Sequence, residues 1–394
     1  MIFQTFDDKK DCIAVYAKGQ MHRKKHPDGM SKTWNYTEFL RDDDIQYAKY
    51  YCEGKSLGEA CPEHLQSEWN EVSHKLEAIY RSVKEADLNL NDHCFFDMLS
   101  DHFLIEYGHI KNKICKHVFK NCEKPANYDF IVDLVKVLTE IKNRKLNIDL
   151  SDLKSRRHQF KVRQFIKRIK KTSPYIIYDA YGTKTGRLTG KSFPILTMDK
   201  SYRKILKPNN EWFLEFDFNA AELRVMLGLL GKEQPEEDLH EWNLDNIYRG
   251  IGDRESAKKR IFAWLYNPQS KDHLSNRFYD RDALLKKYWD GTHIKTCFDR
   301  TIEAPERTAV NYLVQSTAAD LFLRQMIKVW EMLKNKKSYI AFCLHDSLVI
   351  DLAQEDEFVI NDLKEEFANT QFGAFKVNSF GGKNFGEMKR MNLN

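Results

Sequence analysis

Residues 212–227, WFLEFDFNAAELRVML, change their pattern halfway along. In the first half every second residue is large and apolar: Trp212, Leu214, Phe216 and Phe218. That period of two predicts a β-strand, whereas the run AAELRVML that follows is typical of a helix. Asp217 is therefore predicted at the end of a strand, directly before a helix begins.

A second acidic residue, Asp346, occupies the polar tip of a predicted hairpin. The apolar run YIAFCL (339–344) precedes the triplet HDS, and another apolar run, LVI, follows it. An Asp at a turn is most often a turn former, and this holds for either aspartate taken alone. Two aspartates at neighbouring strand ends would instead hold two Mg²⁺ ions for an in-line phosphoryl displacement.

Between the two aspartates, residues 254–266 are predicted to form a helix with an unusual face. Arg254, Lys258, Phe262 and Tyr266 recur every four residues and so lie on one side of it. One interpretation is that the cations meet a triphosphate while the rings contact base and sugar. An ordinary helix with a basic first half and a buried aromatic second half fits the same pattern.

A longer helix is predicted from Pro305 to about Leu333, with a proline near its first turn. Arg307, Asn311 and Gln315 repeat along it at intervals of four. Such a row of long polar side chains could contact the acceptors that every base pair presents in a DNA minor groove. A solvated polar helix face is the alternative.

Residues 154–171 contain nine Lys or Arg residues and no acid. The apolar residues at helical spacing are Val162, Phe165, Ile166 and Ile169. This pattern predicts a helix with one dry side and one strongly basic side, where the basic residues include Lys161, Arg163, Lys167 and Arg168. Such a surface is either merely solvated or follows the phosphates of a nucleic acid.

Composition indicates a globular protein without a membrane span. Hydrophobic residues make up 42% and aromatic residues 13% of the 394 residues. No apolar run approaches the roughly 20 residues that cross a bilayer. The first residues lack a signal-peptide pattern, and eight cysteines occur without a Cys-x-x-Cys pair. We therefore expect a reducing compartment, the cytoplasm.

The order of these segments resembles the family A DNA polymerases, the bacterial DNA polymerase I type. Residues 217–224, DFNAAELR, are similar to the first catalytic motif of that family. The 254–266 helix resembles the fingers helix, and the HDS triplet resembles the second catalytic motif. Two companion segments also match: TGRL at 185–188 and the stretch 307–320 after the fingers.

The resemblance implies an α+β fold with a right-hand architecture: an antiparallel palm sheet, mostly helical fingers and a reduced thumb. Residues 1–120 would form an N-terminal region of unknown role, without exonuclease motifs. The remaining divisions would be 121–177, the start of the palm with the basic thumb-like helix; 178–227, palm with the first catalytic motif; 228–304, fingers; and 305–394, palm with the second catalytic motif.

The resemblance also implies template-directed addition of dNTPs to a primer 3′-hydroxyl. Asp217 and Asp346, with the backbone carbonyl of Phe218, would bind two Mg²⁺ ions, and Mn²⁺ is an alternative ion. The residues implied at the dNTP are Arg254, Lys258, Phe262, Tyr266 and Glu222. Among these, Lys258 would donate a proton to pyrophosphate and Glu222 would exclude a 2′-hydroxyl. The residues implied at the primer–template DNA are Arg187, Arg307, Asn311, Gln315, His345, Lys161, Arg163, Lys167 and Arg168.

Several features depart from the family pattern. Ser347 stands where a glutamate usually follows the second aspartate, and Asn267-Pro268 replaces the usual glycine after Tyr266. Neither Asp-x-Glu on an early strand nor Tyr-x3-Asp occurs in residues 1–150, so we expect no proofreading. The compact size is typical of phage-like replication enzymes. No pattern identifies accessory partners.

Two other functions compete with this interpretation. Ser347 is shared with single-subunit RNA polymerases, so an RNA polymerase or primase-like enzyme using rNTPs is one alternative. Glu222 and the TGRL segment argue against it. The second alternative is a catalytically silent nucleic-acid-binding factor, against which the retention of both aspartates and Lys258 argues.

Overall fold

The computed structural model describes residues 1–8, 11–40, 44–88, 90, 93–267 and 269–393. The chain forms two compact units, Met1–Asn143 and Arg144–Asn394. Within the described ranges, no helix is both long enough and apolar enough to cross a bilayer.

The first unit is built on a three-stranded antiparallel sheet of β1 (Phe3–Asp8), β2 (Asp11–Ala17) and β3 (Gln20–His22). Its helices are α1 (Ala48–Tyr51), α2 (Leu57–Ala60), α3 (Gln66–Glu85), α4 (Asp101–Asn121) and α5 (Tyr128–Asn143), and a short parallel pair joins β4 (Lys32–Thr33) to β5 (Gln46–Tyr47).

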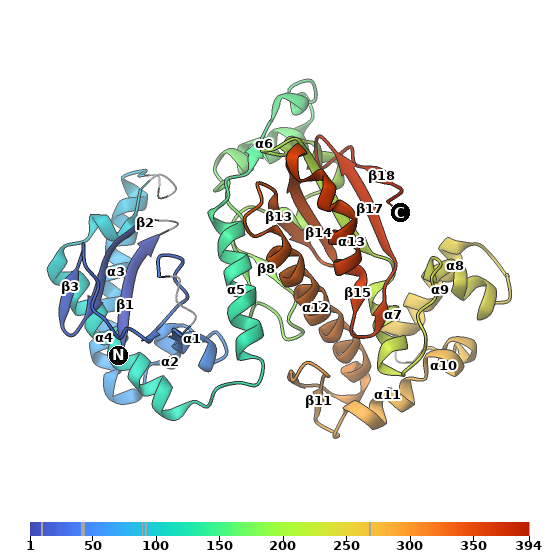
Figure 1. The fold of residues 1–394 in the computed structure, drawn as a ribbon, viewed down its shortest axis with the longest axis horizontal. Helices are drawn as coiled ribbons and strands as arrows, with labels where there is room; N and C mark the ends of the chain where they lie inside the picture. The colour runs from blue at the N-terminus through green and yellow to red at the C-terminus, as the bar shows by residue number, and fades with distance from the viewer. Residues whose placement is uncertain (9–10, 41–43, 89, 91–92, 268, 394) are drawn as a thin grey trace. The chain divides into compact units, whose positions relative to one another are not determined.

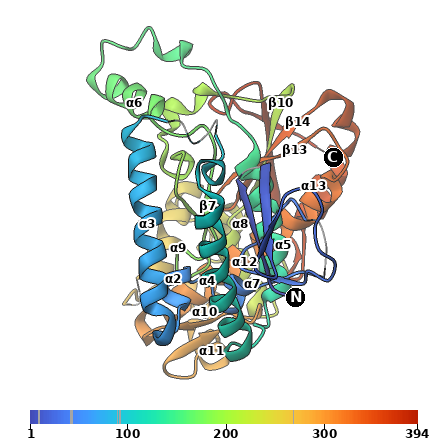
Figure 2. The same ribbon diagram turned by 90° about the vertical axis from the view of Figure 1, so that its left-hand side faces the viewer.

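Helix α4 packs directly on the sheet. A Cβ atom at Gly108 would lie 2.5 Å from the Tyr16 ring, so only glycine permits this approach of helix to strand. Phe6, Leu104 and Ile114 are almost fully buried around this contact. Figure 2 shows α3 and α4 running alongside each other next to these strands.

The first compact unit extends past residue 120 to Asn143, because α5 packs within it. The Tyr128 hydroxyl at the start of α5 accepts a hydrogen bond from the backbone amide of Tyr47 at 2.9 Å. The Tyr128 ring also lies 5.1 Å from the ring of Tyr51 in α1. These contacts attach the helix to the residues that precede it.

The second unit contains a five-stranded antiparallel sheet in the order β13-β14-β10-β17-β18. The strands are β10 (Trp212–Phe218), β13 (Tyr339–Leu344), β14 (Ser347–Leu352), β17 (Val377–Gly382) and β18 (Lys389–Met391). Both predicted features, the strand that ends near Asp217 and the hairpin that carries Asp346, are confirmed. They lie on neighbouring strands, because β10 pairs with β14.

Helices cover one face of this sheet (Figure 1). Phe367 of α13 (Ile360–Ala368) places its ring 4.3 Å from that of Phe218 and 5.9 Å from that of Phe216. Helix α12 (Glu306–Leu333) packs against α13, β13 and α7 (Ala221–Leu229). These contacts fix the ends of β10 and of the hairpin against a helical layer.

The remaining helices of this unit include α9 (Arg254–Tyr266), which has the bounds predicted from the sequence. The others are α6 (Phe160–Lys170), α8 (Leu239–Asn246), α10 (His273–Tyr279) and α11 (Arg281–Tyr288). Short two-stranded pairs join β6 (Asn147–Ile148) to β9 (Leu206–Lys207), β7 (Tyr178–Asp179) to β8 (Thr189–Gly190), β11 (His293–Lys295) to β12 (Thr301–Glu303), and β15 (Asn369–Thr370) to β16 (Gly373–Ala374).

The basic helix is shorter than expected from the 154–171 pattern, because α6 begins at Phe160. Residues 154–159 instead form consecutive turns, in which the amides of Arg157 and Gln159 bond to carbonyls three residues earlier. The Arg163 guanidinium donates to the carbonyl of His158 at 2.9 Å and to that of Arg157 at 3.2 Å. These bonds stabilise the turn that precedes the helix.

Candidate active site

Asp217 lies near the end of the central strand β10, where it pairs with Ser347 of β14 on one side and with Asn378 of β17 on the other. Two residues beyond the strand, Ala220 adopts a left-handed conformation with φ of 54°. This conformation lets the chain turn sharply from the strand into α7. The aspartate therefore stands at the junction of strand and helix.

Asp346 lies in the two-residue turn between β13 and β14. Its neighbour His345 is exposed and has φ of 52°, in the left-handed region that such tight hairpin turns require. The backbone amide of Phe218 donates to the carbonyl of Asp346 at 3.5 Å. The register of β10 with β14 thus brings the two aspartate segments into backbone contact.

Burial disfavours the charged forms of the two aspartates at this site. Burial, followed by the negative charges of Asp346 and Glu215, raises the pKa of Asp217 to about 7, although Lys258 acts in the opposite direction. Burial also raises the pKa of Asp346, and His345 and Arg187 partly offset it. A concentration of buried negative charge of this kind is stabilised by a bound cation.

The carboxylate of Glu222, in the first turn of α7, accepts hydrogen bonds from two other segments. Arg187 donates to one of its oxygens at 2.6 Å, and the Tyr266 hydroxyl donates to the other. Glu222 itself is only 9% exposed. This cluster joins the 185–188 segment, α7 and the end of α9.

A pocket of about 340 Å³ opens beside this cluster. Residues predicted at four separate motifs line it, namely Arg187, Glu222, Tyr266 and Asp346. Phe262 also lines it, and its ring stacks against the Tyr266 ring at 6.0 Å with an interplanar angle of 14°. The structure therefore brings together groups that lie up to 159 positions apart in the chain.

Of the two predicted triphosphate ligands, Arg254 already has a partner. Its guanidinium binds Asp238 through two hydrogen bonds of 3.1 and 2.7 Å. Burial alone would raise the pKa of Asp238, but the bonds from Arg254 and other donors lower it to about 2. Lys258 is half-buried on the same helix face, one turn closer to Phe262. Asp238 is a site residue that the sequence analysis did not identify.

Arg224, in the first motif, points away from the site and is completely buried. Its guanidinium donates to the backbone carbonyls of Asn219, Pro235 and Glu237, each at 2.8 Å. The Asn219 side chain in turn donates to Asp238 at 2.7 Å. A hydrogen-bonded network therefore runs from the end of β10 to the residue that holds Arg254.

The predicted polar row lies along the first half of α12, where Arg307 is exposed and Asn311 and Gln315 are half-buried. Gln315 accepts a hydrogen bond from Thr185 at 2.8 Å, which connects α12 to the 185–188 segment.

Gly186 has φ of 77°, and a Cβ there would lie 2.6 Å from the Arg300 guanidinium, so a larger residue would be strained and would clash.

Arg300 itself forms a buried ion pair with Asp320 of α12, with hydrogen bonds of 2.7 and 3.0 Å. This pair anchors the β11–β12 ribbon to α12. The sequence analysis did not single out Arg300.

Ser347, the departure from the family pattern, donates a hydrogen bond to Glu215 at 2.5 Å. Glu215 lies two residues before Asp217 on β10, so both side chains project from the same face of the strand. The site therefore contains a third carboxylate, on β10 rather than directly after Asp346. The period of two along 213–217 was the signal that could have identified Glu215.

Helix α6 confirms the predicted separation of a dry and a basic side. Val162, Phe165, Ile166 and Ile169 are buried, while Lys161, Lys167 and Arg168 are exposed. The Phe165 ring stacks on Tyr202 at 4.1 Å, which holds the apolar side in place. Arg163 is exposed as well, but its guanidinium is engaged with the preceding turn.

We expect the basic side of α6 to contribute to DNA affinity in a salt-dependent manner. Replacing Lys161, Lys167 and Arg168 by Gln should make the negative slope of log affinity against log salt shallower by up to about 2.7, because each phosphate contact contributes roughly −0.9. Fluorescence anisotropy with a labelled primer–template at several salt concentrations measures this slope.

The matched control removes three exposed lysines beyond the end of α12, Lys334, Lys336 and Lys337, and should leave the slope nearly unchanged. An equal slope in wild type and the α6 variant would contradict a role of α6 in phosphate binding.

The donors at the site suit a hard divalent cation. Among the described residues, no group of three or more His, Cys, Asp or Glu side chains is arranged to hold a metal. An ion here would depend on the carboxylates of Asp217 and Asp346, completed by backbone carbonyls, water and substrate phosphates. Mg²⁺ is typically held in this way, by one or two carboxylates and the phosphates it serves.

Residues 270–387 match the sequence family described as DNA polymerase family A. This range includes the hairpin of Asp346 but not Asp217. Among curated proteins, the chain is 24% identical over 245 residues to the thermostable DNA polymerase I of Thermus filiformis, and 25% identical over 244 residues to DNA polymerase I of Caldicellulosiruptor bescii. Each alignment covers 48% of this chain and 29% of the relative.

The fold is similar to a solved structure, the POL domain of Pol1 from M. smegmatis in complex with DNA primer-template and dNTP. The TM-score is 0.55, with 13% sequence identity, and the match covers 73% of this chain and 76% of that domain. This likeness confirms the α+β fold of a polymerase domain. By the match over residues 270–387 and by these relatives, the chain is similar to family A DNA polymerases.

Proposed function

We propose that this chain is a DNA-directed DNA polymerase that adds dNTPs to a primer 3′-hydroxyl. The observation that carries the proposal is the convergence of Arg187, Glu222, Tyr266 and Asp346 on one pocket, beside Asp217. The relatives' names and the neighbour's complex with primer-template and dNTP support it. In this proposal the five-stranded sheet serves as palm, the segment with α8 to α11 as fingers, and α6 as part of a reduced thumb.

The site residues then have the following roles. Asp217 and Asp346, with the Phe218 carbonyl, would hold two Mg²⁺ ions, which supply charge neutralisation for the attack of the 3′-hydroxyl on the α-phosphate. Lys258 would neutralise the triphosphate and give a proton to the leaving pyrophosphate. Arg254 would release Asp238 and bind the phosphates of the nucleotide instead. Catalysis would thus come from positioning and charge stabilisation.

The nascent base pair would lie against Phe262 and Tyr266, whose stacked rings form one wall of the pocket. Glu222 would lie beneath the sugar. The primer–template would follow the polar row of Arg307, Asn311 and Gln315, with His345 near the primer end and Arg187 alongside.

We also propose that the enzyme does not proofread. β1 contains Asp7 and Asp8, but neither is followed by Glu two positions later. Tyr107 is followed four positions later by Lys111, not by an acid. Residues 1–150 therefore lack both motifs by which carboxylates are supplied to the metal ions of such an exonuclease.

Primer extension with dNTPs and rNTPs in parallel tests this function. We expect extension with dNTPs and little with rNTPs, because a 2′-hydroxyl would meet Glu222, which lines the pocket. With Mg²⁺ and no nucleotide, the labelled primer should keep its length. Efficient extension with rNTPs would favour the RNA polymerase alternative, and no extension with either sugar would favour a silent DNA-binding factor.

A further inference from the structure

Two neighbouring pockets lie wholly within the first unit and share Phe96 and Tyr107 in their linings. The larger, of about 460 Å³, is mainly apolar and aromatic. The smaller, of about 290 Å³, is lined by polar residues, by apolar side chains that include Trp34, and by two charged side chains, Lys111 and Asp7. The two linings together therefore offer a mainly aromatic half and a polar half that contains the ammonium of Lys111, with two shared rings between them.

Lys111 is an unusual residue for such a position. It is only 7% exposed, although it carries an ammonium group at the end of a long side chain. Within the described part of the chain, no acidic oxygen lies within 4 Å of this ammonium. Its near neighbours are rings: Tyr107 at 5.1 Å and Phe6 at 5.9 Å.

Asp7, the acid that lines the same pocket, is engaged elsewhere. One of its carboxylate oxygens accepts a hydrogen bond from Thr5 at 2.7 Å, and the other accepts one from Thr37 at 2.9 Å. Asp7 affects Lys111 only through its charge, and burial lowers the pKa of Lys111 in spite of it. Burying an ammonium without a paired anion is costly, so an anionic group that entered this pocket would supply the missing partner.

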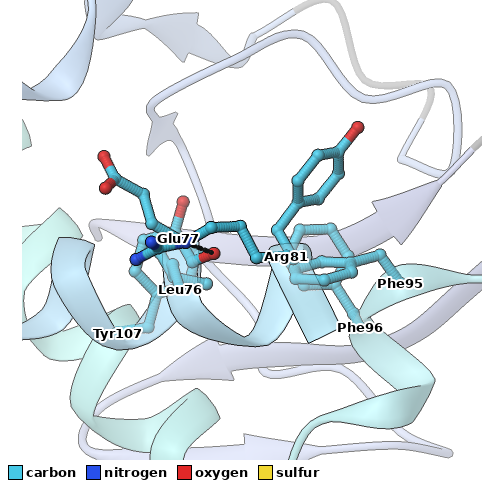
Figure 3. A pocket seen from close by; sticks show the side chains of 7 residues that line it. Leu76, Glu77, Arg81, Phe95, Phe96 and Tyr107 are labelled. Carbon is cyan, nitrogen blue, oxygen red and sulfur yellow. Dashed lines mark hydrogen bonds between the residues drawn. The ribbon is translucent and has the colours of Figure 1, made fainter. Parts of the chain in front are cut away.

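The aromatic half is a nearly continuous set of rings. The Phe96 ring lies 5.8 Å from that of Phe95, which lies 6.0 Å from that of Tyr80. Tyr80 is 53% exposed, so a planar molecule has access to this side. Figure 3 shows Phe95 and Phe96 on one side of the pocket, opposite Arg81 and Glu77. Such rings bind planar bases by stacking, whatever the base.

We propose that the first unit binds a nucleotide, with its base against the aromatic half and its phosphate at Lys111. The charge of Asp7 opposes a highly charged ligand, so a monophosphate should be preferred over a triphosphate. Two sources share this chemistry: a free nucleoside monophosphate and the terminal nucleotide of a single DNA strand. This site is additional to the polymerase pocket and does not depend on it.

Calorimetry with the full-length protein in EDTA tests the proposal, with dAMP, deoxyadenosine, dATP and inorganic phosphate as separate probes. We expect dAMP to bind more tightly than each of the other three. Lys111→Met removes the charge and keeps the length of the side chain. It should weaken dAMP binding by at least about tenfold and leave deoxyadenosine binding unchanged, since hydrogen bonds to charged groups are worth that much.

Lys116→Met is the matched control, because Lys116 lies on the same helix with an exposed side chain. It should bind dAMP as wild type does. Tyr80→Ala, at an exposed position, should weaken dAMP and deoxyadenosine by a similar factor, because both contain the base. A single-stranded hexanucleotide that displaces dAMP from wild type would identify a strand terminus as the source, and failure to displace it would identify the free nucleotide.

Three results would overturn the proposal: equal dAMP affinity in wild type and Lys111→Met, inorganic phosphate binding as tightly as dAMP, or dATP binding more tightly than dAMP. A Lys111→Met protein that melts at the wild-type temperature excludes misfolding as the cause of a loss. Primer extension by this variant should equal that of wild type, so the two functions can fail separately.

Discussion

Replacing Asp217 or Asp346 by Asn should lower the rate of nucleotide incorporation at least about a thousandfold, because several kcal/mol of transition-state stabilisation depend on the ions they would hold. Each change removes one ligand charge and keeps the shape of the side chain. Single-turnover extension of a labelled primer measures the effect. Affinity for the primer–template should stay within a few-fold of wild type, because the basic side of α6 and the polar row of α12 are untouched.

Asp362→Asn provides the control, since it makes the same charge change at an exposed position of α13. It should extend primers at the wild-type rate. Incorporation within about tenfold of wild type by either site variant would contradict the assignment of both aspartates to the metal site.

The second large effect concerns the choice of sugar. Glu222→Ala should reduce the preference for deoxynucleotides by at least about tenfold, measured as the ratio of kcat/KM for dNTP and rNTP, because uniform damage to the enzyme cancels from that ratio. The physical reason is the position of Glu222, which lines the pocket, is largely buried and is held by Arg187 and Tyr266. A 2′-hydroxyl would meet its carboxylate or lack a hydrogen-bond partner.

Glu222→Gln separates size from charge. If Glu222 excludes ribose by its volume, the Gln variant should discriminate nearly as well as wild type, and only the Ala variant should accept ribonucleotides. An unchanged ratio in Glu222→Ala, or a wild type that uses both sugars equally, would contradict the role of Glu222. Ser347, which is shared with single-subunit RNA polymerases, would then be the next residue to test for an effect on sugar choice.

Local patterns were sufficient to predict the elements that carry the site. The alternation along 212–218, the four-residue repeat along 254–266 and the apolar runs around Asp346 each lie within one stretch of chain. The strand, helix and hairpin that they predicted are confirmed. Amphipathic periodicity alone also predicted which residues of α6 are buried, because that pattern directly reports the face toward the core.

Contacts between distant segments could not be predicted in the same way. Ser347 bonds to Glu215, 132 positions away, and Arg254 bonds to Asp238, 16 positions away. Such pairs depend on strand register and helix packing, which no single stretch encodes. The end of the first compact unit at Asn143 could not be predicted either, because α5 joins that unit through contacts with residues far earlier in the chain. Pro268 lies outside the described residues.

The buried Arg224 also has a mechanical consequence. Its guanidinium holds three carbonyls, and losing one would leave a buried charge with too few acceptors, so the three contacts should break together. We therefore expect the chain from Asn219 to Glu237 to move as one piece with the end of β10. Any movement of the helix that carries Arg254 and Lys258, relative to the strand that carries Asp217, would then have its hinge beyond Glu237.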